Sequence, residues 1–296
     1  MALIDTHCHL DAAEFDADRE SVIQQALNHD IQMMIVPAVH RSNFVAVTTL
    51  AQTHPCCAHA LGIHPMYVAT SREEDLAFLE QEVAIQMQSE HPPVAIGEIG
   101  LDYFIADYDK ALQEYYFVEQ LKIAKQYDLP VILHVRRAID DILKHLRKHK
   151  VRGGIAHAFN GSRQQADVFI DLGFKLGFGG ALTYSRALNI RELVSSLPLE
   201  SVVLETDAPD IPPEWLKNDK RNSPNQLLKI SQLIASLRHI NHTQVTEMTT
   251  NNAIEILPNL AKLFTRPQVI QQSTLNAHRN QYQPSNLLFL KDKIRD

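Results

Sequence analysis

Eight short apolar runs, separated by longer amphipathic segments, constrain the fold of this 296-residue chain more than any other feature. Each run is brief and bounded by turn residues, which is the pattern of a strand buried on both faces of a parallel sheet. The segments between them carry apolar residues at helical spacing, as residues 18–30 do with Val22, Ile23 and Ala26 on one side. The predicted strands are residues 2–5, 32–39, 56–64, 93–102, 130–135, 153–159, 174–180 and 201–207.

This rhythm of strand and helix predicts one domain, a (β/α)₈ TIM barrel formed by residues 1–264. The alternative is a doubly wound open sheet, which normally has a glycine-rich phosphate loop after its first strand. Here the sequence His-Cys-His occupies that place and favours the barrel. Residues 265–296 are rich in Gln and Asn and lack a clear period, so they are predicted to be an appended C-terminal tail.

Charge and cysteine content narrow the function classes. The net charge of -7 makes the chain a poor candidate for long-range, sequence-independent binding of duplex DNA. The charge still allows a nuclease that binds only the end of a strand. The three cysteines form no disulfide framework, since their number is odd and two are adjacent. Without a signal-like or membrane-length apolar run, we expect a cytoplasmic protein with no membrane contact, and nothing indicates an obligate protein partner.

Metal-binding side chains collect at the ends of the predicted strands. In LIDTHCHLD, residues 3–11, alternation in an extended segment puts His7 and His9 on one face and Cys8 on the other. The pair alone could be two ordinary buried histidines, but barrel enzymes build their sites on this rim, and burying many uncoordinated polar groups is costly. The metal-capable residues at the strand ends are His7, His9, His64, Glu98, Asp102, His134, His157, Glu205 and Asp207.

Six of these residues are the strongest ligand candidates: His7, His9, Glu98, His134, His157 and Asp207. Three protein groups and a water complete one catalytic zinc site, so six groups fit two ions better than one. Glu98 is the natural bridge, because it lies on a central strand between the histidines. Two cations about 3.5–4 Å apart would hold and activate a water, with Asp207 as its base. The donor set suits Mg, Mn, Zn or Ni without choosing among them.

Five motifs, in this order and spacing, resemble those of the TatD family of metal-dependent deoxyribonucleases: DTHCHLD, GEIGLDY, LHVR, AHAFNGS and LETDAP. The resemblance spans roughly residues 2–263 and implies a TIM barrel that hydrolyses phosphodiesters in DNA. It further implies the following roles: His7, His9 and Asp207 hold the first metal, Glu98 bridges, His134 and His157 hold the second metal, and His64 lies near the substrate phosphate.

The expected activity is therefore a 3′-5′ exonuclease that trims single-stranded DNA ends. One alternative from the same superfamily is a hydrolase of esters or amides, such as an aminoacyl-tRNA deacylase, and another is a non-catalytic metal-binding scaffold. The chain departs from the family in RNSPNQ, residues 221–226, where Ser223 takes the place of a usual glutamate. This difference concerns the loop after the last strand and leaves the predicted ligands unchanged.

Overall fold

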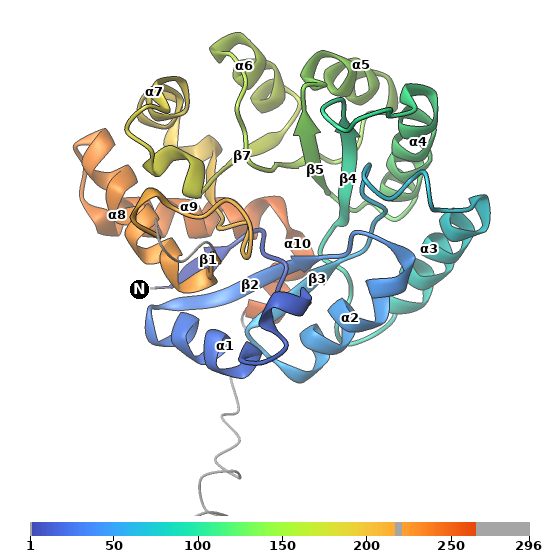
Figure 1. Cartoon of the computed structure of the whole chain (residues 1–296), viewed down its shortest axis with the longest axis horizontal. Coiled ribbons are helices and arrows are strands. Elements are labelled where there is room, and N and C mark those ends of the chain that lie inside the picture. Colours follow the sequence, from blue (N-terminus) through green and yellow to red (C-terminus); the bar gives the residue numbers. More distant parts are fainter. Residues whose placement is uncertain (1, 217–220, 265–296) are drawn as a thin grey trace, which may run out of the picture. The chain divides into compact units, whose positions relative to one another are not determined.

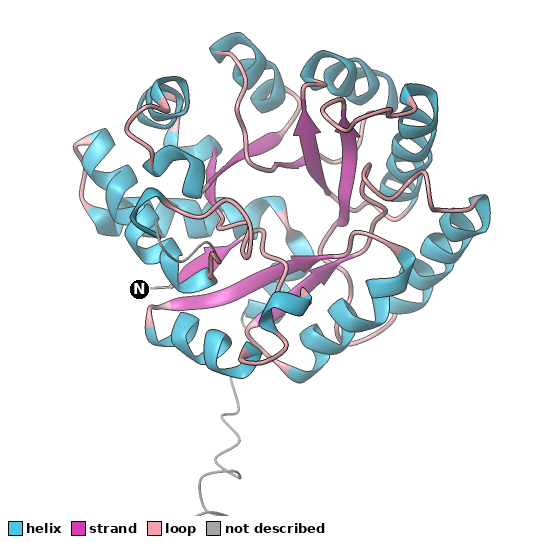
Figure 2. Cartoon of the chain, in the orientation of Figure 1, coloured by secondary structure: helices cyan, strands magenta, loops and turns pink. Residues whose placement is uncertain are grey.

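The computed structural model describes residues 2–216 and 221–264, and within them eight parallel strands form a barrel surrounded by helices (Figure 1). Figure 2 shows the strands enclosed by the helical ring. The strands are β1 (Leu3–Asp5), β2 (Ile31–Pro37), β3 (Cys57–Ala60), β4 (Ile96–Asp102), β5 (Val131–Arg136), β6 (Gly154–Ala156), β7 (Phe174–Phe178) and β8 (Val202–Leu204).

The α-helices of the described residues follow the strands in alternation. They are α1 (Arg19–Asn28), α2 (Phe44–Thr53), α3 (Glu73–Gln86), α4 (Lys110–Gln126), α5 (Ile139–His149), α6 (Arg163–Asp171), α7 (Leu188–Ser196), α8 (Leu227–Arg238), α9 (His242–Ile256) and α10 (Pro258–Phe264). Short 3₁₀ segments lie in the loops: η1 (Ala13–Phe15), η2 (Arg41–Asn43), η3 (Gly180–Thr183), η4 (Leu199–Ser201), η5 (Glu214–Leu216) and η6 (Pro224–Gln226).

Hydrogen bonds at two junctions close the barrel. The ladders run β1-β2-β3 and β4-β5-β6-β7-β8, all in chain order and all parallel. Leu61 joins the two ladders, since the Gly97 amide donates to its carbonyl at 2.9 Å. On the other side, the Thr6 amide donates to the Leu204 carbonyl at 2.9 Å. A doubly wound sheet would reverse its strand order, so this arrangement confirms the predicted barrel.

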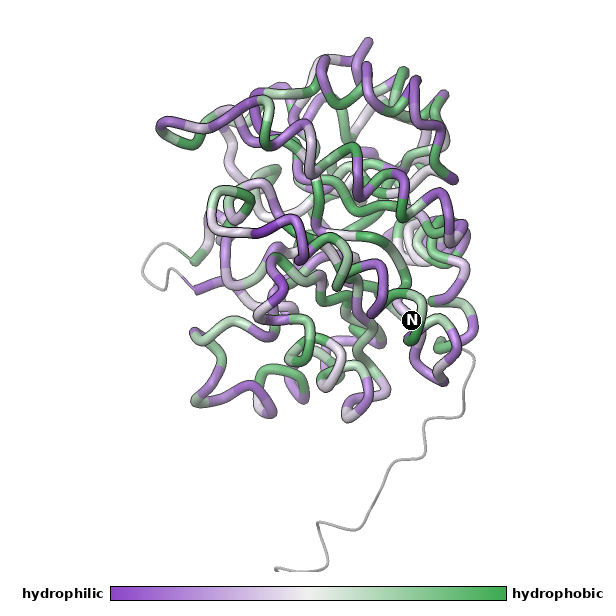
Figure 3. The backbone as a smooth tube through the Cα atoms, turned by 90° about the vertical axis from the view of Figure 1, so that its right-hand side faces the viewer, coloured by the Kyte–Doolittle hydropathy of each residue, from purple (hydrophilic) through white to green (hydrophobic). Residues whose placement is uncertain are grey.

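Two apolar clusters hold the barrel together. The inner cluster takes side chains such as Ile4, Ile35 and Ile132 from the strands and continues into Leu257, before α10, and Leu260, within it. The outer cluster packs the strands against the helices. Figure 3 shows apolar segments running through the interior of the molecule. The N-terminal face of the barrel is therefore filled by α9 and α10, and the C-terminal ends of the strands are left to carry polar groups.

The strands end earlier than the sequence predicts at several places. The predicted segment 201–207 forms β8 only as far as Leu204, and the predicted segment 153–159 forms β6 only as far as Ala156. Asp207 and Ala158 have φ angles of +59° and +45°, which are incompatible with an extended ladder. The functional candidates near these residues consequently lie in loops just beyond the strands.

Within the part of the chain that the structure describes, no helix combines the length and the apolar composition that crossing a membrane requires. The predicted tail, residues 265–296, lies outside the described residues, so the domain boundary after residue 264 stays a prediction.

Candidate metal centre

The structure brings all the predicted site residues to the C-terminal mouth of the barrel. A cavity of about 1520 Å³ opens there, lined by residues of the strands and of the loops that follow them, with all eight strands represented. His7 lies beneath this cavity and is fully buried. The predicted residues that line the cavity are His9, His64, Glu98, His134, His157 and Asp207.

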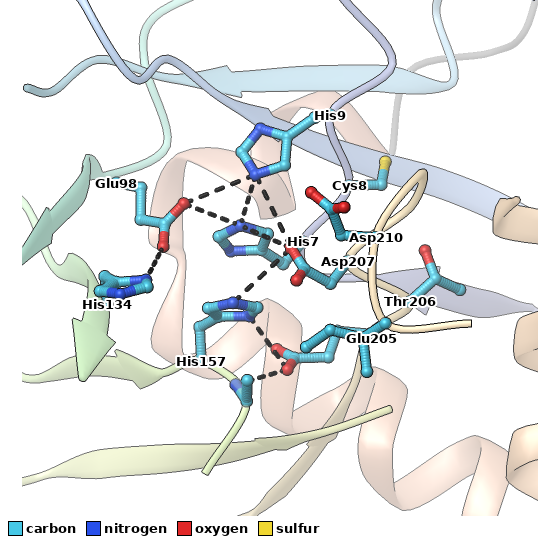
Figure 4. Close-up of polar contacts among 12 residues, drawn as sticks. His7, Cys8, His9, Glu98, His134, His157, Glu205, Thr206, Asp207 and Asp210 are labelled. Atoms are coloured by element: carbon cyan, nitrogen blue, oxygen red, sulfur yellow. Dashed lines mark hydrogen bonds and ion pairs between the residues drawn. The ribbon is translucent and has the colours of Figure 1, made fainter. Parts of the chain in front are cut away.

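Glu98 lies between two sets of imidazoles. Its Oε2 atom is 3.1 Å from His7 Nε2 and 3.5 Å from His9 Nε2. Its Oε1 atom is 2.9 Å from His134 Nδ1 and 3.4 Å from His64 Nε2. Figure 4 shows the carboxylate facing His7 and His9 on one side and His134 on the other. A carboxylate placed in this way has the geometry that a bridging ligand needs.

Asp207 faces three imidazoles from the opposite side of the site. Its Oδ1 atom lies 3.6 Å from His7 Nε2, 3.7 Å from His9 Nε2 and 3.6 Å from His157 Nε2. The Asp207 amide donates to the His7 carbonyl at 2.9 Å, and this bond holds the loop after β8 against the loop after β1. The His157 ring stacks on His7 with 3.7 Å between centroids. The four side chains therefore form one packed cluster.

The spacing of the first group fits a single metal ion. Two ligand atoms bound at about 2.1 Å to a tetrahedral cation are about 3.4 Å apart. The separations from His7 and His9 to Glu98 and Asp207 run from 3.1 to 3.7 Å, and the two Nε2 atoms are 3.2 Å apart. Without a cation, such close lone pairs must share protons. The donor set therefore fits a cation at this point.

A second ion would use the other side of Glu98. On that side, Glu98 Oε1 lies 2.9 Å from His134 Nδ1, and His64 borders the same space. His157 contacts His7 and Asp207, whereas His134 contacts Glu98 and Asp102. The pairing of His134 with His157 around one ion stays a prediction.

A backbone hydrogen bond fixes which ring nitrogen of His64 carries the proton. The Met66 amide donates to His64 Nδ1 at 3.1 Å, so this nitrogen carries a lone pair. In the neutral ring the proton then lies on Nε2, the atom that faces Glu98. A protonated nitrogen donates a hydrogen bond and does not ligate a metal. Burial also lowers the pKa of His64, which favours the neutral form.

Three buried carboxylates contact residues of the site. Glu205 lies 3.0 Å from His157 Nδ1, and Asp102 lies 3.0 Å from His134 Nε2. Asp5 accepts hydrogen bonds from the Thr206 amide at 3.0 Å and from its hydroxyl at 2.6 Å. Carboxylates commonly fix the orientation of metal-binding histidines by binding the second ring nitrogen.

Asp102 and Glu205 were recognised from the sequence as strand-end residues without a role, and Asp5 was missed. One signal was present in the sequence. Asp5 and Glu205 each precede a predicted ligand by two residues, His7 and Asp207, and Asp102 follows Glu98 by four. An even spacing in an extended segment places such pairs on the same side of the chain.

Asn222 supports the loop that carries Asp207. This asparagine is fully buried, and its Nδ2 atom donates to the carbonyls of Thr206 at 2.7 Å and Asp210 at 2.9 Å. It precedes Ser223, the position at which the chain departs from the resembled family. The serine at position 223 thus leaves in place the hydrogen bonds from Asn222 to Thr206 and Asp210, on either side of Asp207.

The pKa values of the buried groups in this cluster are shifted in opposite directions. Burial raises the pKa of Asp207 to about 6, although His157 and His9 act to lower it. Burial acts to lower the pKa of His9, but the Glu98 and Asp207 carboxylates outweigh it and raise the value to about 9. Burial keeps the pKa of His7 well below its usual value. A cation at this point would replace the shared protons.

Comparisons with known proteins identify relatives of this chain. A family model described as TatD related DNase matches residues 4–258. The metal-dependent hydrolase YjjV of Escherichia coli K12 is 40% identical over 253 residues, which cover 84% of this chain and 95% of YjjV. YabD of Bacillus subtilis 168, also a metal-dependent hydrolase, is 32% identical over 253 residues, covering 85% of this chain and 97% of YabD.

Solved structures agree in fold. The crystal structure of YjjV from Escherichia coli K12, described as a TatD homolog, superimposes with a TM-score of 0.82 at 38% identity. The match covers 86% of this chain and 98% of that structure. A TIM barrel with these relatives and this donor set is a metal-dependent hydrolase. More narrowly, the chain belongs to the TatD family.

Proposed function

We propose that this hydrolase cleaves phosphodiester bonds in DNA and that its centre holds two divalent ions bridged by Glu98. The position of Glu98 carries the proposal, because each of its oxygens faces a different pair of imidazoles. His7, His9 and Asp207 would hold one ion, and His134 and His157 the other. When bound, such ions bind a nucleophilic water and neutralise charge on an attacked phosphate.

Asp207 would act as the general base beside its role as a ligand. Its Oδ1 atom lies among the imidazoles of the centre and Asp207 lines the cavity, so the carboxylate is placed to take a proton from a nucleophile there. His64 would bind the substrate phosphate, because its protonated Nε2 faces the centre from the edge of the cavity. Both residues line the cavity, so both would reach a substrate in the mouth of the barrel.

Several observations favour DNA ends as the substrate. The matching family model is described as TatD related DNase. The chain has a net charge of -7, so phosphate binding would depend on the metal centre and on a few local cations. A barrel mouth closed at its base by α9 and α10 accepts a strand end more readily than the middle of a duplex. We therefore propose exonuclease action on single strands, from the 3′ end.

A substrate panel tests this proposal. Purified protein is incubated with end-labelled single-stranded DNA, duplex DNA, RNA and aminoacyl-tRNA, each with Mg, Mn, Zn or Ni and with EDTA. We expect stepwise shortening of single-stranded DNA from its 3′ end that requires metal and is lost in Asp207→Asn. Cleavage of only the aminoacyl ester would move the function to the ester hydrolases, and cleavage of no substrate with any metal would favour a non-catalytic scaffold.

A further inference from the structure

One wall of the cavity combines an exposed aromatic ring with two arginines. Phe104, in the loop after β4, keeps 48% of its surface exposed. The guanidinium carbon of Arg136 lies 3.8 Å from the centre of this ring, and that of Arg137 lies 4.4 Å from it. All three residues line the cavity that contains the metal centre. A large exposed phenylalanine beside two cations needs an explanation, because nothing in the barrel core requires it.

This aromatic wall is joined to the metal centre through Asp102. One oxygen of Asp102 accepts a hydrogen bond from the Phe104 amide at 2.8 Å, while the other lies 3.0 Å from His134 Nε2. Arg136 follows His134 by two residues at the end of β5, and Arg137 comes next with a φ angle of +56°. The same carboxylate thus fixes a candidate metal ligand and the loop that carries the ring.

Both guanidiniums are available to a ligand. Within the described residues, the side chains of Arg136 and Arg137 form no hydrogen bond and no ion pair with another residue of the chain. Lys110, another cation of the cavity, differs because its amine bonds to Asp141 at 2.6 Å. The arginines can therefore offer their planar donor groups to phosphate oxygens.

The opposite side of the cavity carries negative charge. Asp11 and Glu14 come from the loop after β1, and Asp210 comes from the loop after β8. Asp140 and Asp141, near the arginines, also line the cavity, and Asp141 is paired with Lys110 at 2.6 Å. Among the described lysines and arginines that line the cavity, Arg136 and Arg137 are therefore the ones without an ion-pair partner, and an anionic chain in the mouth of the barrel would be attracted to them.

We propose that Phe104, Arg136 and Arg137 form a nucleotide subsite for single-stranded DNA, an inference that rests on the proposed phosphodiesterase function. An unpaired base stacks on the ring and the adjacent guanidinium planes, and the arginines bind the neighbouring phosphate. Tyr108, 38% exposed and stacked on Tyr103 with 4.9 Å between centroids, extends the aromatic surface along the same wall. Duplex DNA is excluded, because its bases are already stacked and paired.

Equilibrium binding tests the aromatic part of the subsite. Full-length protein in EDTA is titrated into a fluorescently labelled single-stranded oligonucleotide, and anisotropy gives the dissociation constant without cleavage. Phe104→Ala should weaken binding about 5- to 150-fold, the range measured for loss of one base-stacking ring. Phe104→Trp should restore binding. The matched control is Tyr115→Ala, which removes an exposed aromatic of α4 that does not line the cavity, and it should bind like wild type.

An abasic oligonucleotide separates stacking from a structural effect. If the ring binds a base, Phe104→Ala loses its effect on an oligonucleotide without bases at its 3′ end. Arg136→Ala and Arg137→Ala should weaken binding to both oligonucleotides and make the slope of log affinity against log salt less negative by about 0.7 each. Arg147→Ala on α5 is the charge control, because Arg147 is exposed and lies outside the cavity.

The outcomes distinguish this subsite from the proposed function. Wild-type binding that is weakened by Phe104→Ala supports the subsite even if no metal yields cleavage, in which case the proposed function fails alone. Normal cleavage and normal binding in Phe104→Ala would overturn the subsite and leave the proposed function intact. Equal weakening of Phe104→Ala on normal and abasic oligonucleotides would also overturn it, because a lost stacking contact cannot act on an absent base.

Discussion

At the scale of the residue, Asp207 combines burial with close contacts to the histidines of the site. Its carboxylate lies 3.6 Å from His7 Nε2 and 3.6 Å from His157 Nε2, and its pKa is raised to about 6 because it is buried. Asp207→Asn keeps the shape and one ligand oxygen but removes the base. We expect the turnover number to fall by about 100-fold or more. Steady-state assays on end-labelled single strands with Mn measure this effect.

The control for that experiment is Asp210→Asn, which changes another acid of the same cavity and should retain most of the activity. Near-normal turnover in Asp207→Asn would show that a different group takes the proton.

His64 provides a second test of an individual residue. Because its Nδ1 accepts from the Met66 amide, its Nε2 is a donor and not a metal ligand. His64→Ala should therefore leave the metal content of the protein unchanged while raising the KM for single-stranded DNA about tenfold, the scale of one charge-assisted hydrogen bond to phosphate. Metal analysis of the dialysed variant, run beside the kinetics, measures both. Loss of one ion from the variant would identify His64 as a ligand.

The sequence predicts that the candidate ligands meet, but it does not predict the residues that support them. His7 and Asp207 each follow or end a buried apolar run and Glu98 lies within another, so topology alone predicts that they meet. Asp5 and Glu205 stand next to the same motifs, yet their roles depend on hydrogen bonds to Thr206 and His157 that only the folded backbone creates. The aromatic wall was also missed, since no sequence period connects Phe104 with Arg137.

At the scale of the element, all eight predicted strands are present, but the residues at which several of them end differ from the prediction. An apolar run indicates that residues are buried, and buried residues continue beyond the last hydrogen bond between neighbouring strands. The segment 56–64 illustrates this, because β3 ends at Ala60 while Leu61 and Ile63 remain buried. The hydrogen-bonding pattern that ends a strand is set by neighbouring strands, which local sequence does not encode.

The contact between β3 and α3 gives a prediction about pH. His59 is fully buried, its Nε2 lies 2.7 Å from Gln86 Oε1, and burial lowers its pKa to about 4. The unfolded chain binds this proton near pH 6.5, so the stabilisation is complete above that pH and is lost as the pH falls toward 4. Between pH 7.5 and pH 5 the loss should be about 2 kcal/mol.

Urea unfolding in EDTA at these two pH values measures the change in the free energy of unfolding. His59→Gln keeps a donor for Gln86 but cannot titrate, so its free energy of unfolding should fall by about 2 kcal/mol less than that of wild type. Equal losses in the two proteins would mean that His59 is protonated in the folded barrel.

At the scale of the whole molecule, the barrel is closed at its base by α9 and α10. Leu257 and Leu260 are fully buried against the inner cluster. Truncation after Phe264 should therefore leave the melting temperature, metal content and hydrolysis unchanged. Truncation after Ile256 removes both leucines and should destabilise the protein by several kcal/mol. Loss of folding or activity on truncation after Phe264 would show that residues 265–296 belong to the barrel. The cytoplasmic location and the lack of an obligate protein partner also stay predictions.

The metal content of Glu98→Ala tests the central claim most directly. Wild-type protein and the variant are loaded with Mn or Zn, dialysed and analysed for metal, and urea unfolding in EDTA checks that the variant still folds. We predict about two ions per wild-type chain and fewer than one per variant chain, with hydrolysis lost, because the bridge supports both ions. Two ions retained by folded Glu98→Ala protein, or only one in the wild type, would contradict a binuclear centre bridged by Glu98.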